Sequence, residues 1–439
     1  ELAARRFIGQ RRAHFDIVCF YQEENIMDFS ELVSAWNNTA PLFAESVSEW
    51  AGNLGINSIV VLMMAIFMLV GAIDRICGNK LGYGEQFEEG INAMGGLAMS
   101  MAGVVAVAPV LALVLKPIFG PLYGLVGADP AMFATTLLAC DMGGYPLAMA
   151  MAANETIGNY AGLILGTMMG ATIVFTIPVA LGIIEPEDRS YLGAGTLVGI
   201  VAIPFGCIAG GLMMNTTQYK IGIGEILINL IPVVIIAIAI AAGLWFAPSG
   251  MMKGFDKFGS GVTIFITAVT ALAIFQYNTG IKLPIFAAML DDSLIGGEGV
   301  NGLESGLLTC GQIAIVLAGA YPMVKFVSEK FGKALGKIGS ALGMNSVGST
   351  GLVATLANNI AMFNILKDMN PKAKLLNCAF ATCAAFLFGD HLGFCAANNP
   401  EMIVPMLVGK IVAGVIAVVL GNVMAPALLA KIPAAKKAE

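Results

Sequence analysis

Charged residues are scarce in this sequence, and their scarcity excludes the usual soluble classes. Asp, Glu, Lys and Arg make up 12% of the 439 residues, about half the share found in an ordinary soluble domain. Hydrophobic residues make up 58%, which excludes a disordered chain. The net charge is −6, and the four arginines near the start are followed by no basic stripe. We therefore expect no nucleic-acid partner.

Histidines and paired cysteines are also few. The chain has two histidines, His14 and His391, and no HExxH motif. Its eight cysteines form no CxxC pair, so no zinc or iron–sulfur site is indicated. No Walker motif for ATP hydrolysis is present. We expect neither a resident metal nor another cofactor.

Long apolar stretches are what the sequence has in abundance. Many of them reach 18 residues, the length that predicts a transmembrane helix. The predicted fold class is an all-α polytopic membrane protein with about 9 to 11 transmembrane helices. The eleven stretches fall at about 56–73, 91–115, 130–152, 158–184, 190–214, 223–247, 259–290, 306–327, 347–366, 375–396 and 402–429.

The distribution of Lys and Arg bears on how many stretches cross the membrane. If all eleven cross, the basic residues after the first stretch divide 8 against 10. If the third and ninth stretches enter the membrane and return on the same side, the division becomes 15 against 3, with Lys116, Lys220 and Lys282 on the poorer side. Cytoplasmic loops carry an excess of Lys and Arg. This pattern favours nine crossings, but eleven remain open.

The same two stretches contain helix-breaking residues. The third includes Asp141-Met-Gly-Gly-Tyr-Pro146, and the ninth includes Asn358-Asn359. Gly and Pro interrupt helices, and Asn side chains compete for backbone hydrogen bonds. Irregular backbone at membrane depth survives only inside protein or beside a polar cavity. We therefore predict two broken or re-entrant helices.

A weak internal repeat relates these two stretches. At an offset of 216 residues, 6 of 16 positions are identical, and the offset places the Asp141 break opposite Ala357-Asn358. With nine crossings the two repeats are expected to be inverted, as in secondary transporters, whose site lies where the repeats meet. The alternative is a helical bundle with parallel repeats. The identities pair Glu88, Gly90, Gly95, Ala98, Ala102 and Gly103 with Glu304, Gly306, Gly311, Ala314, Ala318 and Gly319.

The N-terminal segment differs from the rest of the chain. Residues 1–26 lack the pattern of a signal peptide, so Met27 is a candidate start. Residues 30–51, with Trp36 and Trp50, are expected to form either an interfacial helix or a poorly ordered tail. The predicted division of the chain is a tail at 1–55, a first membrane repeat at 56–215, a linking helix region at 216–258, a second repeat at 259–430 and a short basic tail at 431–439.

Asp141 is the first candidate for a binding role. A carboxylate inside the membrane is costly, so it is a functional candidate by default. Asp141 is followed by Gly143 and Gly144, where the backbone can approach a ligand. A carboxylate together with the free carbonyls of a helix end suits a small cation. Alternatively, Asp141 caps the half-helix that follows.

Asp390-His391 and the two asparagines are further candidates. An Asp beside a His can relay protons or orient a hydroxyl group, or the two can be a loop pair at a helix end. Asn358 and Asn359 can bind a hydroxyl and an ammonium group together, or they can form interhelical hydrogen bonds. The acidic loop around Glu88 is expected to be a solvated connector.

Several of these motifs resemble the bacterial ethanolamine-utilization permease (EutH-type) family. The resemblance covers about residues 55–430. It implies a protein of the bacterial cytoplasmic (inner) membrane that imports ethanolamine for catabolism and is not an enzyme. The stretches that carry it are Gly78–Gly90, Gly127–Phe133, Asp141–Ala148, Asn358–Phe363 and Gly389–Gly393.

Ethanolamine suits the candidate residues, because it is a protonated amine that also carries a hydroxyl group. The ammonium needs a carboxylate, and the hydroxyl needs an amide or an imidazole. Tyr145 can add a cation–π contact of about 0.5–2 kcal/mol. The predicted substrate site consists of Asp141, Gly143, Gly144, Tyr145, Asn358, Asn359, Asp390 and His391.

Two other functions stay open. The first is an ion-coupled transporter of another small amine or of an amino acid, whose carboxylate would need a cationic partner. Lys410 is the one evident cation within a stretch. The second is an integral membrane enzyme or receptor that uses Asp390-His391. The oligomeric state and the coupling ion are not set by the sequence.

Overall fold

The computed structural model describes residues 29–52, 54–291 and 300–432. Every regular element in these ranges is a helix, which confirms the all-α fold class. The chain separates into two compact units, residues 1–58 and 59–439, which are described one at a time. Residues 1–26, with Met27, and the basic tail beyond 432 lie outside the described residues.

The first unit is formed mainly by α2 (Phe29–Gly52). Residues 30–51 are thus helical, as the first of the two alternatives expects. Trp36, Phe43 and Trp50 are exposed, and their spacing of seven residues places them along one face of the helix. That this face contacts a membrane surface stays a prediction.

The remaining elements run from α3 to α17. They are α3 (Ile56–Ile76), α4 (Tyr83–Gly124), α5 (Ala131–Leu137), η1 (Cys140–Met142), α6 (Gly144–Met151), α7 (Glu155–Asn159), η2 (Tyr160–Gly170), η3 (Thr172–Thr176), α8 (Ile177–Ile183), η4 (Pro186–Asp188), α9 (Arg189–Met214), α10 (Ile223–Phe246), α11 (Pro248–Thr279), η5 (Phe286–Leu290), α12 (Gly302–Ala341), α13 (Ser346–Ala357), α14 (Asn359–Asn364), η6 (Leu366–Asp368), α15 (Pro371–Ala384), α16 (Asp390–Asn398), η7 (Pro400–Met402) and α17 (Ile403–Leu429).

Eight helical segments of the described chain are long and apolar enough to cross a membrane. Their outer faces carry rows of exposed aliphatic side chains, such as Ile231, Ile235 and Ile238 on α10. Such rows are expected where a helix contacts lipid. The chain is therefore a multi-pass membrane protein. The eight segments are Ile56–Ile76, Tyr83–Gly124, Glu155–Ile183, Pro186–Met214, Ile223–Phe246, Pro248–Thr279, Gly302–Lys330 and Pro400–Leu429.

The third and ninth stretches are broken where the sequence predicts. In the third, α5 ends at Leu137 and α6 begins at Gly144, and Gly143 between them has φ 87°. In the ninth, Asn358 separates α13 from α14 with an extended backbone, and its side chain accepts a hydrogen bond from Ile360 N. None of these four helices is among the candidate spans. The re-entrant path itself stays a prediction.

Two distortions were not predicted from the sequence. The tenth stretch is interrupted at residues 385–389, between α15 and α16. The amides freed there bond to the end of α13, with Phe386 N donating to Thr355 O at 3.1 Å and Phe388 N to Leu356 O at 2.9 Å. The fourth stretch winds as a π-helix over η2 and η3, a form often found at functional sites.

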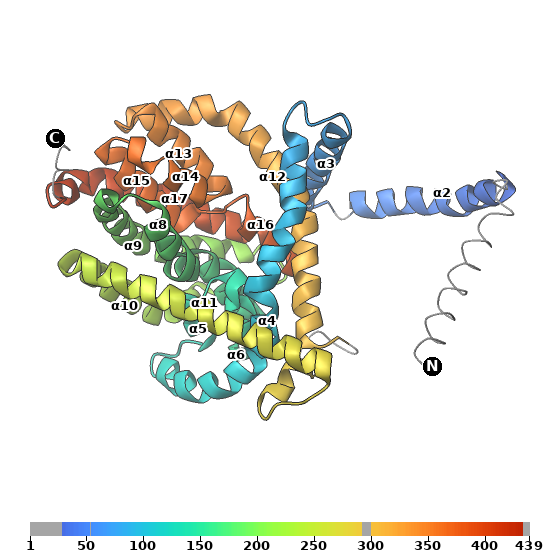
Figure 1. Cartoon of the computed structure of the whole chain (residues 1–439), viewed down its shortest axis with the longest axis horizontal. Helices are drawn as coiled ribbons and strands as arrows, with labels where there is room; N and C mark the ends of the chain where they lie inside the picture. Colours follow the sequence, from blue (N-terminus) through green and yellow to red (C-terminus); the bar gives the residue numbers. More distant parts are fainter. Residues whose placement is uncertain (1–28, 53, 292–299, 433–439) are drawn as a thin grey trace, which may run out of the picture. The chain divides into compact units, whose positions relative to one another are not determined.

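Close backbone contacts hold the long helices together. In the second unit α4 lies beside α12, and α9 packs on α15 and α17 (Figure 1). A Cβ atom on Gly206 of α9 would lie 2.5 Å from the carbonyl oxygen of Gly409 on α17. Glycine is thus required where these two helices meet. Every residue of η2 is buried against this group of helices.

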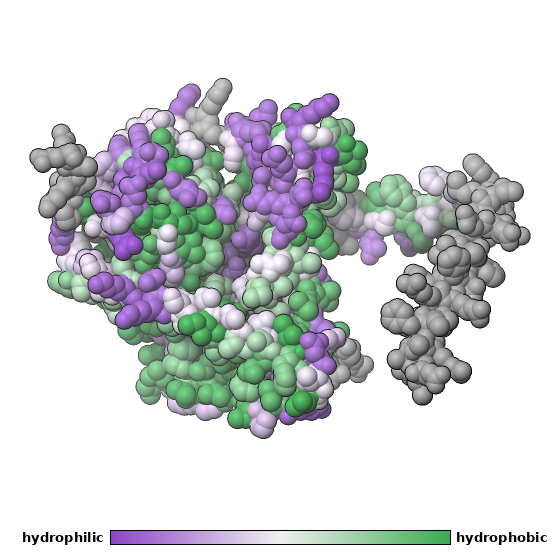
Figure 2. Space-filling view, in the orientation of Figure 1, coloured by the Kyte–Doolittle hydropathy of each residue, from purple (hydrophilic) through white to green (hydrophobic). Residues whose placement is uncertain are grey.

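Hydrophilic side chains gather at one end of the second unit. Figure 2 shows them around the α3–α4 connection and the second half of α12, whereas much of the rest of this face is apolar. Arg75, Lys80 and Lys330 are exposed in this region. This is the end that the Lys and Arg distribution predicts to be cytoplasmic.

Candidate functional site

Asp141 lies in η1, within the break of the third stretch. The first turn of α6 is preceded by Gly143, and no side chain caps it. The alternative that Asp141 caps this half-helix is therefore wrong. The thiol of Cys140 lies 3.9 Å from Oδ1 of Asp141. The carboxylate of Asp141 also lies within 4.8 Å of a ring nitrogen of His391 on α16.

The two glycines that follow Asp141 have a structural task of their own. A Cβ atom on Gly143 would overlap the side chain of Val104, and one on Gly144 would lie 2.6 Å from the carbonyl oxygens of Leu138 and Ala139. The lack of space for a Cβ atom thus explains why both positions are glycine. Their contact with a ligand stays a prediction.

Asp390 and His391 form the first turn of α16, which contacts η1. The hydroxyl of Tyr321 donates to Oδ1 of Asp390 at 2.6 Å. His391 is 2% exposed, so the pair lies at an interface between helices and not in an exposed loop, and its relay role stays a prediction. Ligand atoms of Cys140, Asp141 and His391 all lie within 4.8 Å of one another. The structure thus brings Asp141 and His391 together, with Asp390 next to His391 in the chain.

Lys410 is the residue of this cluster that is missing from the predicted site. It belongs to α17 and is 1% exposed. Its Nζ donates to the carbonyl oxygen of Thr167 at 2.5 Å and lies 3.0 Å from Nδ1 of His391. Across the described ranges, no carboxylate lies within ion-pair distance of it. The available signal was a single cation in an otherwise apolar span.

A divalent metal does not fit this cluster well. Cys140, Asp141 and His391 are residue types that bind metals. However, the amine of Lys410 lies 3.0 Å from Nδ1 of His391. A proton of this amine would compete with a metal for the lone pair of Nδ1. The cluster is better suited to protons and to an organic cation. That no resident metal is needed stays a prediction.

Tyr145 lies on α6, one residue beyond its start. Its ring contacts the ring of Phe394 edge-on, with 5.7 Å between the centroids. Its hydroxyl donates to Oδ1 of Asn159 at 3.2 Å. The ring, rather than the hydroxyl, is therefore the part of Tyr145 that remains to contact a cation.

The asparagines of the ninth stretch have separate roles. Asn358 accepts the amide of Ile360 at 2.8 Å and thus caps α14. Asn359 is fully buried, and its Nδ2 donates to Oγ1 of Thr176 at 3.0 Å, as the interhelical alternative expects. Oδ1 of Asn359 is buried with no hydrogen-bond partner. Of the two, only Asn359 keeps a free acceptor for a ligand.

A cavity of about 380 Å³ lies between α4, α6, α12 and α16. Its lining includes Tyr145, Thr309, Phe394 and Asn398. Tyr145 is the one predicted site residue in its lining, and Asp141, Asp390 and His391 are not part of it. That the cavity leads to these residues stays a prediction.

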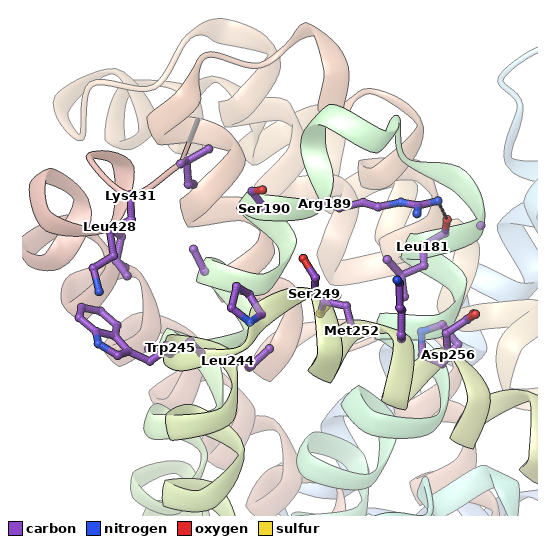
Figure 3. A pocket seen from close by; sticks show the side chains of 17 residues that line it. Leu181, Arg189, Ser190, Leu244, Trp245, Ser249, Met252, Asp256, Leu428 and Lys431 are labelled. Atoms are coloured by element: carbon purple, nitrogen blue, oxygen red, sulfur yellow. Dashed lines mark hydrogen bonds between the residues drawn. The ribbon is translucent and has the colours of Figure 1, made fainter. Parts of the chain in front are cut away.

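A second cavity, of about 650 Å³, lies between α8, α9, α10, α11 and α17. Figure 3 shows Trp245 and Lys431 at one end of it and Arg189 toward the other, with Ser249 between them. Lys431 Nζ lies 3.2 Å from the centre of the Trp245 ring. None of the predicted site residues lines this cavity.

The acidic segment around Glu88 is not a loop, because α4 begins at Tyr83, so the expected connector is wrong. Glu88 lies near the start of this helix and forms an exposed ion pair with Arg75 at 3.1 Å. Its repeat partner Glu304 completes the capping box of α12 with Asn301.

The chain is similar to proteins of one family over most of its length. The profile of the family described as "Ethanolamine utilisation protein, EutH" matches residues 56–424. The "Probable ethanolamine permease EutH" of Listeria monocytogenes is 50% identical over 380 residues, which cover 86% of this chain and 96% of that protein. The protein of the same description from Escherichia coli is 47% identical over 400 residues, covering 85% and 96%. No solved structure matches the chain.

Proposed function

The chain belongs to the ethanolamine utilisation protein (EutH) family, and we propose from this premise that it is a permease for ethanolamine. Relatives described as ethanolamine permeases match it over nearly their whole length. Eight candidate spans support a transporter. The observation that carries the proposal is the group of a carboxylate, a thiol and an imidazole, from Asp141, Cys140 and His391, at the meeting point of broken segments.

The chemistry of ethanolamine suits this cluster. We assign its ammonium group to Asp141, with Asp390 nearby, because a buried cation needs a compensating charge. Asp390 already accepts a hydrogen bond from Tyr321 at 2.6 Å, so Asp141 is the carboxylate that we assign to the ammonium. The hydroxyl group can bond to His391 or to the free Oδ1 of Asn359.

We place the permease in the cytoplasmic membrane of a bacterium, where it imports ethanolamine for catabolism. The bacterial relatives and the excess of Lys and Arg on one side support this location. The uncharged amine crosses lipid unaided. A carrier therefore matters most at low pH, where the protonated form dominates.

One observation favours a second substrate class. An amino acid needs a cation for its carboxylate, and Lys410 lies in the cluster with Asp141 within range of its charge. Competition of alanine, choline and ethanolamine for uptake separates the two classes. We expect ethanolamine to compete best.

The first test is uptake of labelled ethanolamine at about pH 6 by cells that lack other ethanolamine carriers. We expect saturable uptake only when this chain is present, with the label recovered as unchanged ethanolamine. Conversion of the label to another compound in closed vesicles would instead support a membrane enzyme that uses Asp390-His391.

The Asp141→Asn variant tests the site itself. Loss of a buried charge partner costs about 2–5 kcal/mol, so we expect apparent affinity to fall by about 30-fold or more. Asp256→Asn is the matched control, because Asp256 is exposed and lies on α11 away from the cluster. Normal uptake by Asp141→Asn, at equal amounts of membrane protein, would remove Asp141 from the site.

A further inference from the structure

The surroundings of Lys410 are unusual for a lysine. Its amine is buried, and its hydrogen-bonding partners are the carbonyl of Thr167 and the ring nitrogen of His391. Neither partner carries a negative charge when His391 is neutral or protonated. Burying an ammonium group without an opposite charge is strongly unfavourable. The charge of Lys410 therefore depends on a carboxylate near the cluster.

His391 contacts both Lys410 and Asp141: Nζ of Lys410 lies 3.0 Å from its Nδ1, and a ring nitrogen lies within 4.8 Å of a carboxylate oxygen of Asp141. Of the other carboxylates, Asp390 accepts the hydroxyl of Tyr321 at 2.6 Å, and Glu401, on η7 next to α17, accepts the amide of Gln218. The charge of Asp141 is therefore the one that Lys410 shares with a cation that enters the cluster. The titratable side chains on the elements packed against α17 near this point are Cys140 and Asp141 on η1, Tyr160 on η2, Cys207 on α9, Cys383 on α15, Asp390, His391 and Cys395 on α16, and Glu401 on η7.

We propose that the substrate ammonium and the Lys410 proton alternate as the counter-charge of Asp141, so that the chain exchanges one protonated amine for one proton. This inference rests on the proposed function. With the site empty of substrate, Lys410 is an ammonium beside Asp141. When the protonated amine binds Asp141, Lys410 gives one proton to Nδ1 of His391 and becomes neutral.

The proton balance closes over one cycle. His391 releases the proton from its other ring nitrogen to water on the side from which the amine came, and a shift of the remaining proton from Nδ1 to that nitrogen restores Nδ1 as an acceptor. After the amine leaves on the opposite side, Lys410 takes up one proton there and again neutralises Asp141. One positive charge moves in each direction, so the cycle carries no net charge across the membrane.

The test uses the full chain in sealed vesicles, with labelled ethanolamine outside and a pH dye inside. After subtraction of uptake by vesicles without the chain, into which the uncharged amine leaks, we expect one proton to leave for each ethanolamine that enters, at a saturable rate that an imposed potassium diffusion potential does not change. Uptake that follows the potential and moves no proton would overturn the exchange and leave the permease intact. The absence of any uptake would overturn both.

Variants of Lys410 give a second readout. Lys410→Met cannot carry the proton that neutralises Asp141 in the substrate-free protein. The empty site therefore cannot turn back to the side from which the amine came. We expect net uptake to fall by about tenfold or more, the effect of adding about 1.4 kcal/mol to the return barrier, while exchange of labelled for unlabelled ethanolamine continues. Lys410→Arg keeps a permanent charge beside Asp141, so both processes should be lost.

Lys116→Met, at an exposed position of α4, is the control and should keep both processes. Each variant is first checked for a single peak in size-exclusion chromatography. Net uptake by folded Lys410→Met at the wild-type rate would overturn the proposal. If that variant does not fold, the wild-type proton count decides.

Discussion

At the scale of single residues, a partly buried lysine and a buried one on neighbouring helices show how surroundings change a role. Lys374 on α15 lies 2.5 Å from a carboxylate oxygen of Asp188, which is 2% exposed. Lys410 on α17 has no such partner within reach among the described residues. The first lysine belongs to a permanent ion pair, whereas the second can exchange its proton.

The ion pair of Lys374 leads to a stability prediction. Asp188→Asn leaves the partly buried Lys374 without its counter-charge, so the free energy of unfolding should fall by about 3 kcal/mol. The double variant Asp188→Asn/Lys374→Met should recover most of this loss. Thermal unfolding of the detergent-solubilised protein measures both. Equal midpoints for Asp188→Asn and the wild type would contradict this account.

Part of the candidate site could be predicted because polar residues are rare inside apolar stretches. That rarity points to Asp141, Asp390 and His391, of which the structure brings Asp141 and His391 together. Lys410 is as rare, but its importance depends on which face of α17 meets His391. A sequence gives the depth of a residue along a helix more readily than its neighbours across helices.

At the scale of elements, breaks were predictable where the cause is local. Gly143 and the asparagine at 358 disrupt a helix by their own backbone preferences. The break at 385–389 has another cause, because its amides bond to carbonyls at the end of α13. Such tertiary hydrogen bonds leave no periodic pattern in the sequence.

Gly143 provides the test of a local break. Alanine there would have to adopt φ near 87° and would overlap Val104. We expect Gly143→Ala to lower the free energy of unfolding by about 2–4 kcal/mol, from the left-handed backbone and from overpacking together. Gly143→Ala/Val104→Ala should regain only the packing part. A thermal midpoint unchanged in Gly143→Ala would show that the break does not depend on this glycine.

The bounds of the elements also bear on the predicted repeat. The side chain of Asn154 caps α7, and that of Asn370, 216 residues later, caps α15. The pair α5 and α6 is followed at the same offset by α13 and α14. This agreement supports the repeat, whose inverted orientation stays a prediction.

At the scale of the whole molecule, inverted repeats place equivalent loops on opposite sides of the membrane. The exposed positions Ala153 and Lys367 follow the two broken segments. The test uses a background variant of this chain in which Cys19 and Cys77 are replaced by serine. In intact cells, we expect a membrane-impermeant maleimide to label Ala153→Cys in this background. Lys367→Cys should react only after the cells are opened. Labelling of both from one side would contradict the inverted arrangement.

The lone amine of Lys410 also limits how much substrate such a protein can accumulate. An exchange of one cation for one proton stops when the inside-to-outside ratio of protonated amine equals that of protons. In an acidic medium the flux would therefore halt with less amine inside than outside. Continued import requires a reaction inside the cell that consumes the amine as it arrives, so the chemical driving force comes from metabolism rather than from the membrane potential.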